Sequence, residues 1–528
     1  MTTAEMSQTG TPTPAPLDPG LVRRLAALVT AAPGRPQQPS YAPFDGTLVG
    51  EVPTCTADDV AEAQRRARAA QQEWAARPLS ERRAILLRYH DLVLERQEQI
   101  LDITQVETGK NRISAFEELA DVAMTARYYA NTAAKHLRPT RRRGALPVLT
   151  RTVEHHHPKG VIGVISPWNY PLTLAVSDAI PALLAGNGIV LKPDAQTPFT
   201  ALIAVELLVE AGLPRDLFQV VTGAGKDLGT PLIEGVDYLM FTGSTATGRI
   251  VAEQCASRLI GFSAELGGKN PMLVLADADL DKAVEGAVRA CFSNSGQLCI
   301  SVERMYVEEA VYDRFVPAFV ERVRAMTLAP GLTWDADMGS LVSRQQFDAV
   351  TAHVDDAVAK GARVLAGGRP RPDLGPLFYE PTVLEGVTEE MDLCRDETFG
   401  PVVAVTRVAD ADEAVRRAND TDYGLNASVW STPARGAEIA TRVQAGTVNV
   451  NEGYAAAWAS LDAPMGGMKQ SGVGRRHGRE GIVKYTEPQT VAVQRGMPIG
   501  PVPGQPRERY AAVMTTGLKL LKRAPFRR

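Results

Sequence analysis

Two short segments of this chain carry side chains that could perform covalent chemistry. Glu265 stands in FSAELGGKN, and Cys299 stands in FSNSGQLCI. A thiol attacks as the thiolate, so a catalytic cysteine needs a base or a polarising group close by. The glycines beside both residues allow backbone amides to approach a small ligand. The pair is typical of a base and a nucleophile, although most cysteines are small buried hydrophobic residues and most glutamates are solvated.

The composition narrows the class of protein. A chain of 528 residues is too long to fold around a single hydrophobic core, so its length predicts two or three domains. Its 45% hydrophobic and 22% charged residues are typical of a globular protein, and a net charge of -4 argues against a general nucleic-acid binder. No stretch is apolar over the roughly 18 residues that a membrane span needs. Five cysteines without CxxC pairs predict neither a disulfide framework nor a zinc site, and they fit a reducing cytoplasm.

The first part of the chain is expected to be helical after a disordered leader. Residues 1–18 are rich in Thr, Pro and Ser without periodicity. Helices are predicted from Thr56, from Ser80 and over residues 111–137, because capping residues and helical patterns begin there. A β-prone segment, VLTRTVEHHHPKG, follows. Its three histidines do not favour a metal site, since neighbours on a strand point to opposite faces and no acid or thiol cluster accompanies them.

Residues 160–263 alternate β-prone runs with amphipathic helical runs. The β-prone runs are VIGVIS, GIVLK, LFQVV, YLMFTG and LIGFSAE. This alternation predicts a parallel sheet with helices on both faces. Because ligands of such sheets bind at the carboxyl ends of the strands, the turns after VIGVIS, GIVLK and YLMFTG are the expected places for a site.

These turns carry residues suited to binding a ligand. After VIGVIS, two prolines hold Asn169, whose amide could donate to a developing oxyanion. After YLMF, Gly243 and Ser244 precede a helix, and a helix start with free amides suits a pyrophosphate. Neither this turn nor the glycine cluster at 223–229 has the GxGxxG spacing, so each could also be an ordinary strand-to-helix turn.

The end of the chain is rich in proline and then basic. The run RYAAVMTTGLKLLKR is amphipathic if it is helical. We expect a helix packed on the protein's own surface, and weak contact with a membrane is the alternative.

Six motifs occur in order along the chain: PWNYP, LKPDAQTP, FTGST, ELGGKN, GQLC and ETFGPV. Together they resemble the aldehyde dehydrogenase superfamily over residues 40–495. The segments between them, including GLNASVW and SGVGRRHG, are most similar to the succinate-semialdehyde dehydrogenases of actinobacteria. The resemblance implies an α/β fold with a Rossmann-type cofactor domain, an α/β catalytic domain and a small β oligomerisation domain, in a homodimer or homotetramer. The implied boundaries are 1–18 for the leader, 19–144 and 158–266 for the NAD(P)-binding domain, 267–483 for the catalytic domain, 145–157 and 484–496 for the oligomerisation strands, and 497–528 for the C-terminal tail.

The same resemblance implies a role for each site residue. Cys299 attacks the aldehyde, while the side-chain amide of Asn169 and the Cys299 backbone N–H stabilise the oxyanion. Hydride transfer to the nicotinamide leaves a thioester, and Glu265 activates the water that releases the acid. The implied cofactor-binding residues are Ser166, Trp168, Lys192, Ala195, Gly225, Gly229, Gly243, Ser244, Leu266, Glu397 and Phe399. The implied substrate pocket contains Tyr170, Ser293, Tyr454 and Trp458.

Departures from the family's pattern bear on the cofactor and the substrate. Ala195 replaces a glutamate that repels a 2′-phosphate, so we expect NADP as cofactor, with NAD as the alternative and the neighbouring Asp194 as a counterweight. Asp178 stands where many relatives have a lysine, so a proton relay assigned to that lysine does not transfer. Ser177 and Ser293 stand where well-known succinate-semialdehyde enzymes carry arginines that clamp the substrate carboxylate.

The leading hypothesis is NAD(P)-dependent oxidation of succinate semialdehyde, with a small aldehyde as the partner and no nucleic acid, metal or membrane. A broad or aromatic aldehyde oxidiser is the alternative within this class, because Tyr170, Tyr454 and Trp458 are aromatic and the arginines are missing. A non-catalytic binding protein on the same scaffold would predict a lost thiol or base. A thiol hydrolase would leave FTGST and ETFGPV unexplained.

Overall fold

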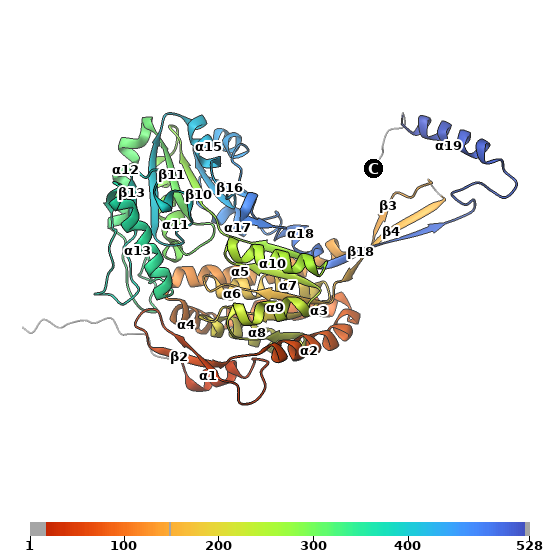
Figure 1. Cartoon of the computed structure of the whole chain (residues 1–528), viewed down its shortest axis with the longest axis horizontal. Helices are drawn as coiled ribbons and strands as arrows, with labels where there is room; N and C mark the ends of the chain where they lie inside the picture. Colours follow the sequence, from red (N-terminus) through yellow and green to blue (C-terminus); the bar gives the residue numbers. More distant parts are fainter. Residues whose placement is uncertain (1–16, 147–148, 523–528) are drawn as a thin grey trace, which may run out of the picture. The chain divides into compact units, whose positions relative to one another are not determined.

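The computed structural model describes residues 17–146 and 149–522, which fall into two compact units (Figure 1). Among the described residues, the larger unit contains 17–136 together with Pro158–Tyr485. The smaller unit contains 137–146, 149–157 and 486–522. Of the expected disordered leader, residues 1–16 lie outside the described residues. Asp18 caps the first helix, since its Oδ2 accepts a hydrogen bond from Leu21 N at 2.8 Å.

Helices and a hairpin precede the first large sheet. The predicted helices from Thr56, from Ser80 and over 111–137 are confirmed, and Thr56 forms a capping box with Asp59 at the start of its helix. Two further helices and a β-hairpin were not anticipated. The helices are α1 (Pro19–Ala26), α2 (Ala57–Ala76), α3 (Leu79–Glu95), α4 (Gln97–Thr108) and α5 (Arg112–Leu137), and the hairpin strands are β1 (Gln37–Tyr41) and β2 (Leu48–Pro53).

The predicted parallel sheet is confirmed as a six-stranded sheet in the order β17-β9-β8-β5-β6-β7. Its parallel strands are β5 (Val161–Ile165), β6 (Gly188–Lys192), β7 (Phe218–Val220), β8 (Tyr238–Thr242) and β9 (Gly261–Glu265), and β17 (Gly472–Val473) pairs antiparallel with β9. The connecting helices are α6 (Pro171–Val176), α7 (Ala179–Leu184), α8 (Pro198–Glu210), α9 (Gly225–Gly235) and α10 (Thr245–Ser257). Strands β5, β6, β8 and β9 therefore end at one edge of the sheet, where a ligand is expected to bind.

A second sheet has seven strands in the order β12-β13-β14-β11-β10-β15-β16. All neighbours pair parallel except β12 and β13. The strands are β10 (Asn270–Val274), β11 (Val302–Glu308), β12 (Arg363–Ala366), β13 (Thr382–Glu385), β14 (Val402–Val408), β15 (Asn426–Trp430) and β16 (Thr447–Val450). The helices of this region are α11 (Leu280–Phe292), α12 (Glu309–Arg324), α13 (Arg344–Ala359), α14 (Asp392–Arg395), α15 (Ala411–Asn419), α16 (Pro433–Ala440), α17 (Ala455–Ala459) and α18 (Gly478–Val483).

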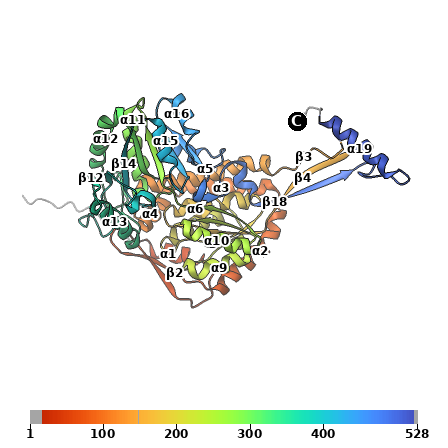
Figure 2. The ribbon, with the colours of Figure 1, turned by 45° about the horizontal axis from the view of Figure 1, so that its top comes forward.

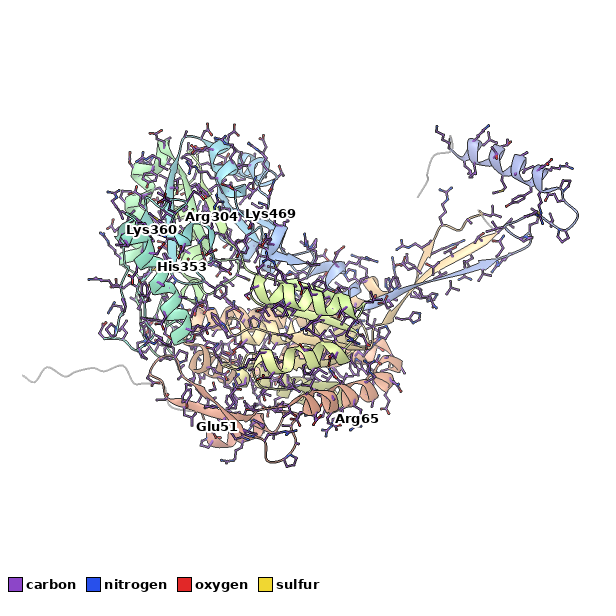
Figure 3. The ribbon with its side chains drawn as sticks, in the orientation of Figure 1. Glu51, Arg65, Arg304, His353, Lys360 and Lys469 are labelled. Atoms are coloured by element: carbon purple, nitrogen blue, oxygen red, sulfur yellow. The ribbon has the colours of Figure 1, made fainter. Side chains whose placement is uncertain are left out.

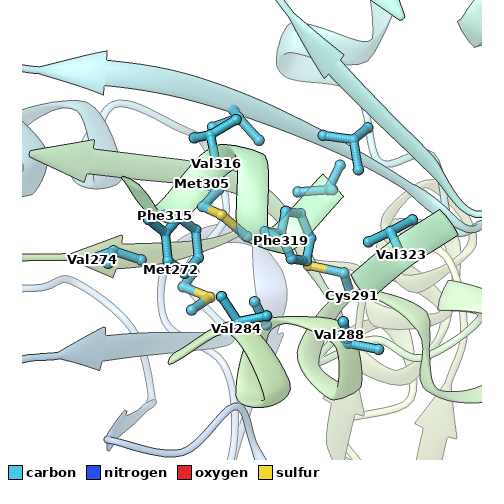
Figure 4. Close-up of a cluster of buried hydrophobic side chains, with 14 of the residues drawn as sticks. Met272, Val274, Val284, Val288, Cys291, Met305, Phe315, Val316, Phe319 and Val323 are labelled. Carbon is cyan, nitrogen blue, oxygen red and sulfur yellow. The ribbon is translucent and has the colours of Figure 1, made fainter. Parts of the chain in front are cut away.

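Helices α11 and α12 cover one face of this second sheet (Figure 2). Their buried side chains meet those of the central strands in a sulfur-rich and aromatic core (Figure 4). The rings of Phe315 and Phe319 stack at 5.9 Å, and Met272 and Met305 fill the space next to the strands. This core fixes α11, whose C-terminal end leads directly into the loop that carries Cys299.

The smaller unit contains a three-stranded sheet in the order β18-β4-β3 and a terminal helix. Its elements are β3 (Thr140–Arg142), β4 (Thr150–Pro158), β18 (Thr486–Gln494) and α19 (Arg507–Leu521). The helix predicted for the basic run is confirmed as α19, and none of its residues is buried within the smaller unit. Its packing on the protein's own surface stays a prediction. Throughout the described ranges, no group of three or more His, Cys, Asp or Glu side chains is arranged to hold a metal ion. No helix of those ranges is both long and apolar enough to cross a bilayer.

Candidate active site

Cys299 lies on a tight loop between α11 and β11. The loop begins with a short 3-10 turn at Ser293–Gly296, in which Asn294 and Ser295 adopt left-handed conformations with φ of 50° and 55°. Asn270 holds the loop by donating from Nδ2 to the Cys299 carbonyl at 2.8 Å. Burial, together with the negative charges of nearby carboxylates, raises the pKa of the Cys299 thiol to about 12. The resting thiol is therefore protonated and needs a base or a bound cation to become a nucleophile.

Asn169 joins this loop from the turn after β5. Its Nδ2 donates to Gln297 O at 3.2 Å, two residues before the cysteine. Its backbone carbonyl accepts from Asn294 Nδ2 at 3.0 Å and from Lys110 Nζ at 2.6 Å. The backbone of Asn169 is thus held by two hydrogen bonds, and its side-chain amide contacts the Cys299 loop through a third, as a preorganised oxyanion donor requires.

Glu265 ends strand β9 and is 5% exposed. Burial raises the pKa of Glu265 to about 7. The negative charge of Asp178 also raises this pKa, whereas the positive charges of Arg476 and Lys484 lower it. The charges of Glu265 and Glu397 both raise the pKa of Cys299, so the two carboxyls and the thiol lie close enough to influence one another. A carboxylate with this pKa is poised to accept and release a proton near neutrality.

A buried charge cluster that the sequence analysis missed stands behind Glu265. Asp178 Oδ2 lies 2.6 Å from Arg476 Nη2, and Asp178 Oδ1 accepts from Lys484 Nζ at 3.0 Å and from Tyr485 Oη at 3.2 Å. Burial favours the neutral acid, but the two cations outweigh it and lower the pKa of Asp178 to about 2. Arg476 and Lys484, from the C-terminal part of the chain, supply the positive charges around Asp178.

The expected cofactor residues after the strands gather at the edge where the parallel strands end. Ser166 and Trp168 follow β5, Lys192 ends β6, and Leu266 follows β9. Lys192 is 4% exposed, and its Nζ donates to Pro193 O at 3.1 Å. The remaining members of this group are Ala195 after β6, Gly225 and Gly229 on α9, and Gly243 and Ser244 before α10.

Several details of this edge fit a dinucleotide. Ser244 caps α10 by accepting from Thr247 N at 3.3 Å, which leaves a helix start with amide donors. Gly229 faces open space. A Cβ added at Gly248 would lie 2.5 Å from Leu266 Cδ2, so only glycine lets α10 pack this closely against the residue that follows β9.

Glu397 and Phe399 reach the same site from the second sheet. Glu397 Oε1 accepts from Gly268 N at 2.8 Å, and burial together with the charge of Glu303 raises the pKa of Glu397 to about 8. Phe399 has a positive φ of 53°, and its ring meets the edge of Trp168 with centroids 5.4 Å apart. The loop is held by Glu303, which accepts from Phe399 N at 2.8 Å.

Helix α13 supports this loop from the other side. Gln346 Nε2 donates to Phe399 O at 2.8 Å, and the ring Nδ1 of His353 lies 3.1 Å from Thr398 Oγ1. His353 and Arg304 are labelled in Figure 3, and Arg304 donates from Nε to Lys269 O at 2.8 Å. Residues of α13 therefore hold the loop that carries Phe399, and Arg304 of β11 holds the segment that follows β9.

The expected substrate residues lie beside the thiol. Tyr170, Tyr454 and Trp458 pack in one apolar cluster with Cys299, and all three aromatic residues line a cavity of about 130 Å³. Ser293 does not line that cavity. Two acidic residues of the lining, Glu117 and Asp121, were missed by the sequence analysis, because they lie on a helix that reads as an ordinary amphipathic one.

Comparisons with known proteins define the class. The model of the Aldehyde dehydrogenase family matches residues 30–491, and the chain belongs to this family of NAD(P)-dependent oxidoreductases. It is 56% identical to a protein of Mycolicibacterium smegmatis with the provisional name succinate-semialdehyde dehydrogenase [NADP(+)], over 98% of this chain and 100% of that protein. It is 53% identical to a similarly named protein of Mycobacterium tuberculosis H37Rv, over 96% of this chain and 98% of that protein.

Solved structures agree with this assignment. An NADP-dependent enzyme of E. coli is 34% identical, with a TM-score of 0.84, over 88% of this chain and 97% of that one. An aldehyde dehydrogenase of Brucella melitensis biovar abortus is 33% identical, with a TM-score of 0.86, over 92% of this chain and 100% of that one. The expected fold class and superfamily are therefore confirmed.

Proposed function

We propose that this chain oxidises an aldehyde to the carboxylic acid with NADP+, through a covalent bond to Cys299. The Cys299 thiol releases its proton to solvent, and the thiolate adds to the aldehyde carbon. The Asn169 amide and the Cys299 N–H donate to the oxyanion that forms. When bound, the nicotinamide ring supplies the acceptor for the hydride that leaves this carbon, so the carbon becomes a thioester. Glu265 then takes a proton from the water that attacks the thioester, which releases the acid and the thiol.

The observation that carries this proposal is the shared site of a thiol, a buried carboxylate and a fixed amide. The pKa of Glu265, about 7, suits a base that works near neutrality. The Asn169 side chain already contacts the loop of Cys299 at Gln297 O. A thiol hydrolase would leave the cofactor edge and the Trp168 and Phe399 contact without a role.

NADP is proposed as the cofactor, with NAD as the alternative. The names of the mycobacterial relatives specify NADP(+). In this chain Ala195 brings no carboxylate to the edge that follows Lys192. Asp194 is engaged in its own turn, because its Oδ1 accepts from Gln196 N at 2.9 Å. Repulsion of a 2′-phosphate is therefore expected to be weak.

Two substrate classes are proposed. Succinate semialdehyde is the first candidate, because relatives that cover almost the whole chain carry that name. A broad or aromatic aldehyde is the second, and a specific observation favours it: the cavity beside Cys299 is lined by Tyr170, Tyr454 and Trp458, and no described residue of its lining is Lys or Arg. No basic side chain of the described lining could therefore bind the carboxylate of succinate semialdehyde in this cavity.

Further parts of the proposal concern the domains, the assembly and the location. We assign residues 19–144 and 158–266 to cofactor binding, 267–483 to the catalytic domain and 497–528 to the C-terminal tail. We assign 145–157 and 484–496 to contacts in a homodimer or homotetramer, which fits the exposure of β18 from Glu487 onward. All five cysteines are unpaired, as suits the proposed cytoplasmic location.

The experiment is a substrate panel with both cofactors. Purified protein is incubated with succinate semialdehyde, butanal or benzaldehyde, and reduced cofactor and carboxylic acid are measured together. We expect one acid for each reduced cofactor, loss of both in Cys299→Ala, and retention of both in the control Cys394→Ala, which alters a half-buried cysteine elsewhere. Equal turnover in Cys299→Ala and the wild type would contradict the proposal.

A further inference from the structure

A buried lysine contacts the turn that carries Asn169. Lys110 lies between α4 and α5 in the segment ETGKN, and its side chain is fully buried. Gly109 makes this position possible, because it ends α4 with a positive φ of 75° and a Cβ there would lie 2.2 Å from Ser340 Oγ. A buried ammonium group is costly unless its charge is paired and its N–H donors are used.

The Lys110 ammonium makes three contacts. Its Nζ donates to Glu118 Oε1 at 2.5 Å and to Asn169 O at 2.6 Å. It also lies 4.2 Å from the centroid of the Tyr170 ring, a cation–π distance. Burial lowers the pKa of Lys110, and the negative charge of Glu118 opposes that shift. Because Asn169 and Tyr170 both belong to the turn after β5, the ammonium holds this turn directly.

Glu118 completes the ion pair from α5 and is also fully buried. Its Oε2 accepts from Leu172 N at 2.8 Å and from Thr173 N at 3.2 Å, two amides in the first turn of α6. Such amides have no carbonyl partner within their own helix, so the carboxylate satisfies them. One oxygen of Glu118 therefore holds the residues after Asn169, and the other orients the lysine that holds Asn169 itself.

The start of α5 also contacts the loop of Cys299. Ser114 Oγ accepts from Asn294 N at 3.0 Å. Asn294 Nδ2 donates to Asn169 O and to Gln297 O, both at 3.0 Å. The oxyanion donor and the nucleophile's loop are thus held from the same short stretch of the chain. A misplacement of about 1 Å between reacting groups can cost about 100-fold in rate, so this shared support bears on turnover.

We propose that Lys110 and Glu118 are positioning residues that act through Asn169, because their ion pair fixes the turn that carries the oxyanion-donating amide. The inference rests on the proposed aldehyde oxidation and deepens it. A preorganised donor needs no rearrangement when the oxyanion forms, and removing such a donor costs about 100- to 1,000-fold in rate. Loosening the support of Asn169 should cost part of that factor and leave the contacts of the nucleotide unchanged.

The test asks whether the effect of Lys110 depends on the side chain of Asn169. Lys110→Met, Asn169→Ala and the double variant are assayed with saturating NADP+. The substrate is the aldehyde that the wild type oxidises fastest among succinate semialdehyde, butanal and benzaldehyde. We expect Lys110→Met to lower kcat/KM for the aldehyde about tenfold, which equals about 1.4 kcal/mol. In the Asn169→Ala background the same change should lower it less than about twofold, because the amide through which Lys110 acts is gone.

Binding and stability separate positioning from a purely structural role. Calorimetry should give a Kd of Lys110→Met for NADP+ within about twofold of the wild type. Asn169→Ala keeps the backbone carbonyl that Lys110 binds, so Lys110→Met should lower Tm equally in both backgrounds. An equal loss of kcat/KM in both backgrounds would mean that Lys110 supports the fold alone, and it would overturn the inference. Wild-type kcat/KM in a folded Lys110→Met protein would overturn it as well.

A control and a second variant complete the design. Arg68→Met is the matched control, because it removes an ion pair of 2.9 Å with Asp237 at the opposite edge of the sheet, where β5 and β8 begin. It should leave kcat/KM unchanged. If Lys110→Met does not fold because Glu118 is left buried without its cation, Lys110→Met combined with Glu118→Gln removes both charges and carries the same expectation. Failure of the proposed function looks different, because the wild type would then oxidise none of the three aldehydes with either cofactor.

Discussion

Replacing Asp178 by asparagine should move the pH dependence of thioester hydrolysis toward lower pH. Asp178 is ionised, with a pKa of about 2, and its negative charge raises the pKa of Glu265. Arg476 and Lys484 act in the opposite direction and remain in Asp178→Asn. Removing the negative charge therefore lowers the pKa of Glu265. Because the base acts as the carboxylate, hydrolysis becomes faster on the acid side.

We take the effect of the Asp178 charge on Glu265 as about one pKa unit, which corresponds to about 1.4 kcal/mol of differential interaction between the two protonation states. A shift of Glu265 from about 7 to roughly 6 would raise its ionised fraction at pH 6 from about 9% to about 50%. We therefore expect hydrolysis at pH 6, relative to its plateau at high pH, to rise about fivefold.

The assay separates hydrolysis from hydride transfer. Rapid mixing with excess aldehyde at pH 5.5–8.5 gives a burst of reduced cofactor and then a steady rate, and the steady rate reports hydrolysis wherever a burst is seen. Tyr485→Phe is the matched control, because it removes a hydrogen bond to Asp178 without changing the charge. Thermal unfolding identifies any loss of folding, since Asp178→Asn leaves two buried cations less well paired. An unchanged or higher apparent pKa in a folded Asp178→Asn protein would refute the reasoning.

Three further predictions concern the proposed site. Cys299→Ala should lose aldehyde oxidation, because the thiol forms the covalent bond, and it should keep NADP+ binding nearly intact, because the thiol does not hold the nucleotide. Calorimetry measures the binding, and wild-type turnover in Cys299→Ala would contradict the prediction. Glu265→Gln should retain the burst of reduced cofactor but slow the steady rate, since an amide cannot accept a proton from water, and a lost burst would mean that Glu265 acts earlier. Ala195→Glu should shift preference toward NAD about fivefold if about 1 kcal/mol of the repulsion survives solvent screening, and an unchanged kcat/KM ratio would disprove this.

The sequence predicted the parts of the fold that depend on local patterns. The alternation over residues 160–263 predicted strands and helices from the spacing of apolar residues. The helix start at Thr56 was predicted from its capping residue. Both signals depend only on residues that are close in the sequence. The residues Asn169, Glu265 and Cys299 were found because each stands beside glycine or proline in a motif. Their positions in space could be inferred only through the resemblance to a family.

The charged groups that surround these residues could not be predicted in the same way. Asp178 meets Arg476 and Lys484 across a sequence separation of about 300 residues, and no local pattern specifies such a contact. Glu117 and Asp121 lie on α5, where polar residues would be expected to face solvent. That helix is buried on several sides, so its acids enter the core and the cavity.

The strained turn before Cys299 has a consequence for engineering a more heat-resistant variant. Asn294 and Ser295 hold left-handed conformations, which cost non-glycine residues roughly 1–3 kcal/mol each. Their side chains offset this cost by hydrogen bonds to Asn169 O at 3.0 Å and Gly339 O at 3.1 Å. A substitution such as Ser295→Gly would relax the backbone and release one of the contacts that fix the nucleophile's loop. Gains in heat resistance here would come at the expense of turnover, so stabilising changes are better placed on the exposed faces of helices such as α2 or α3.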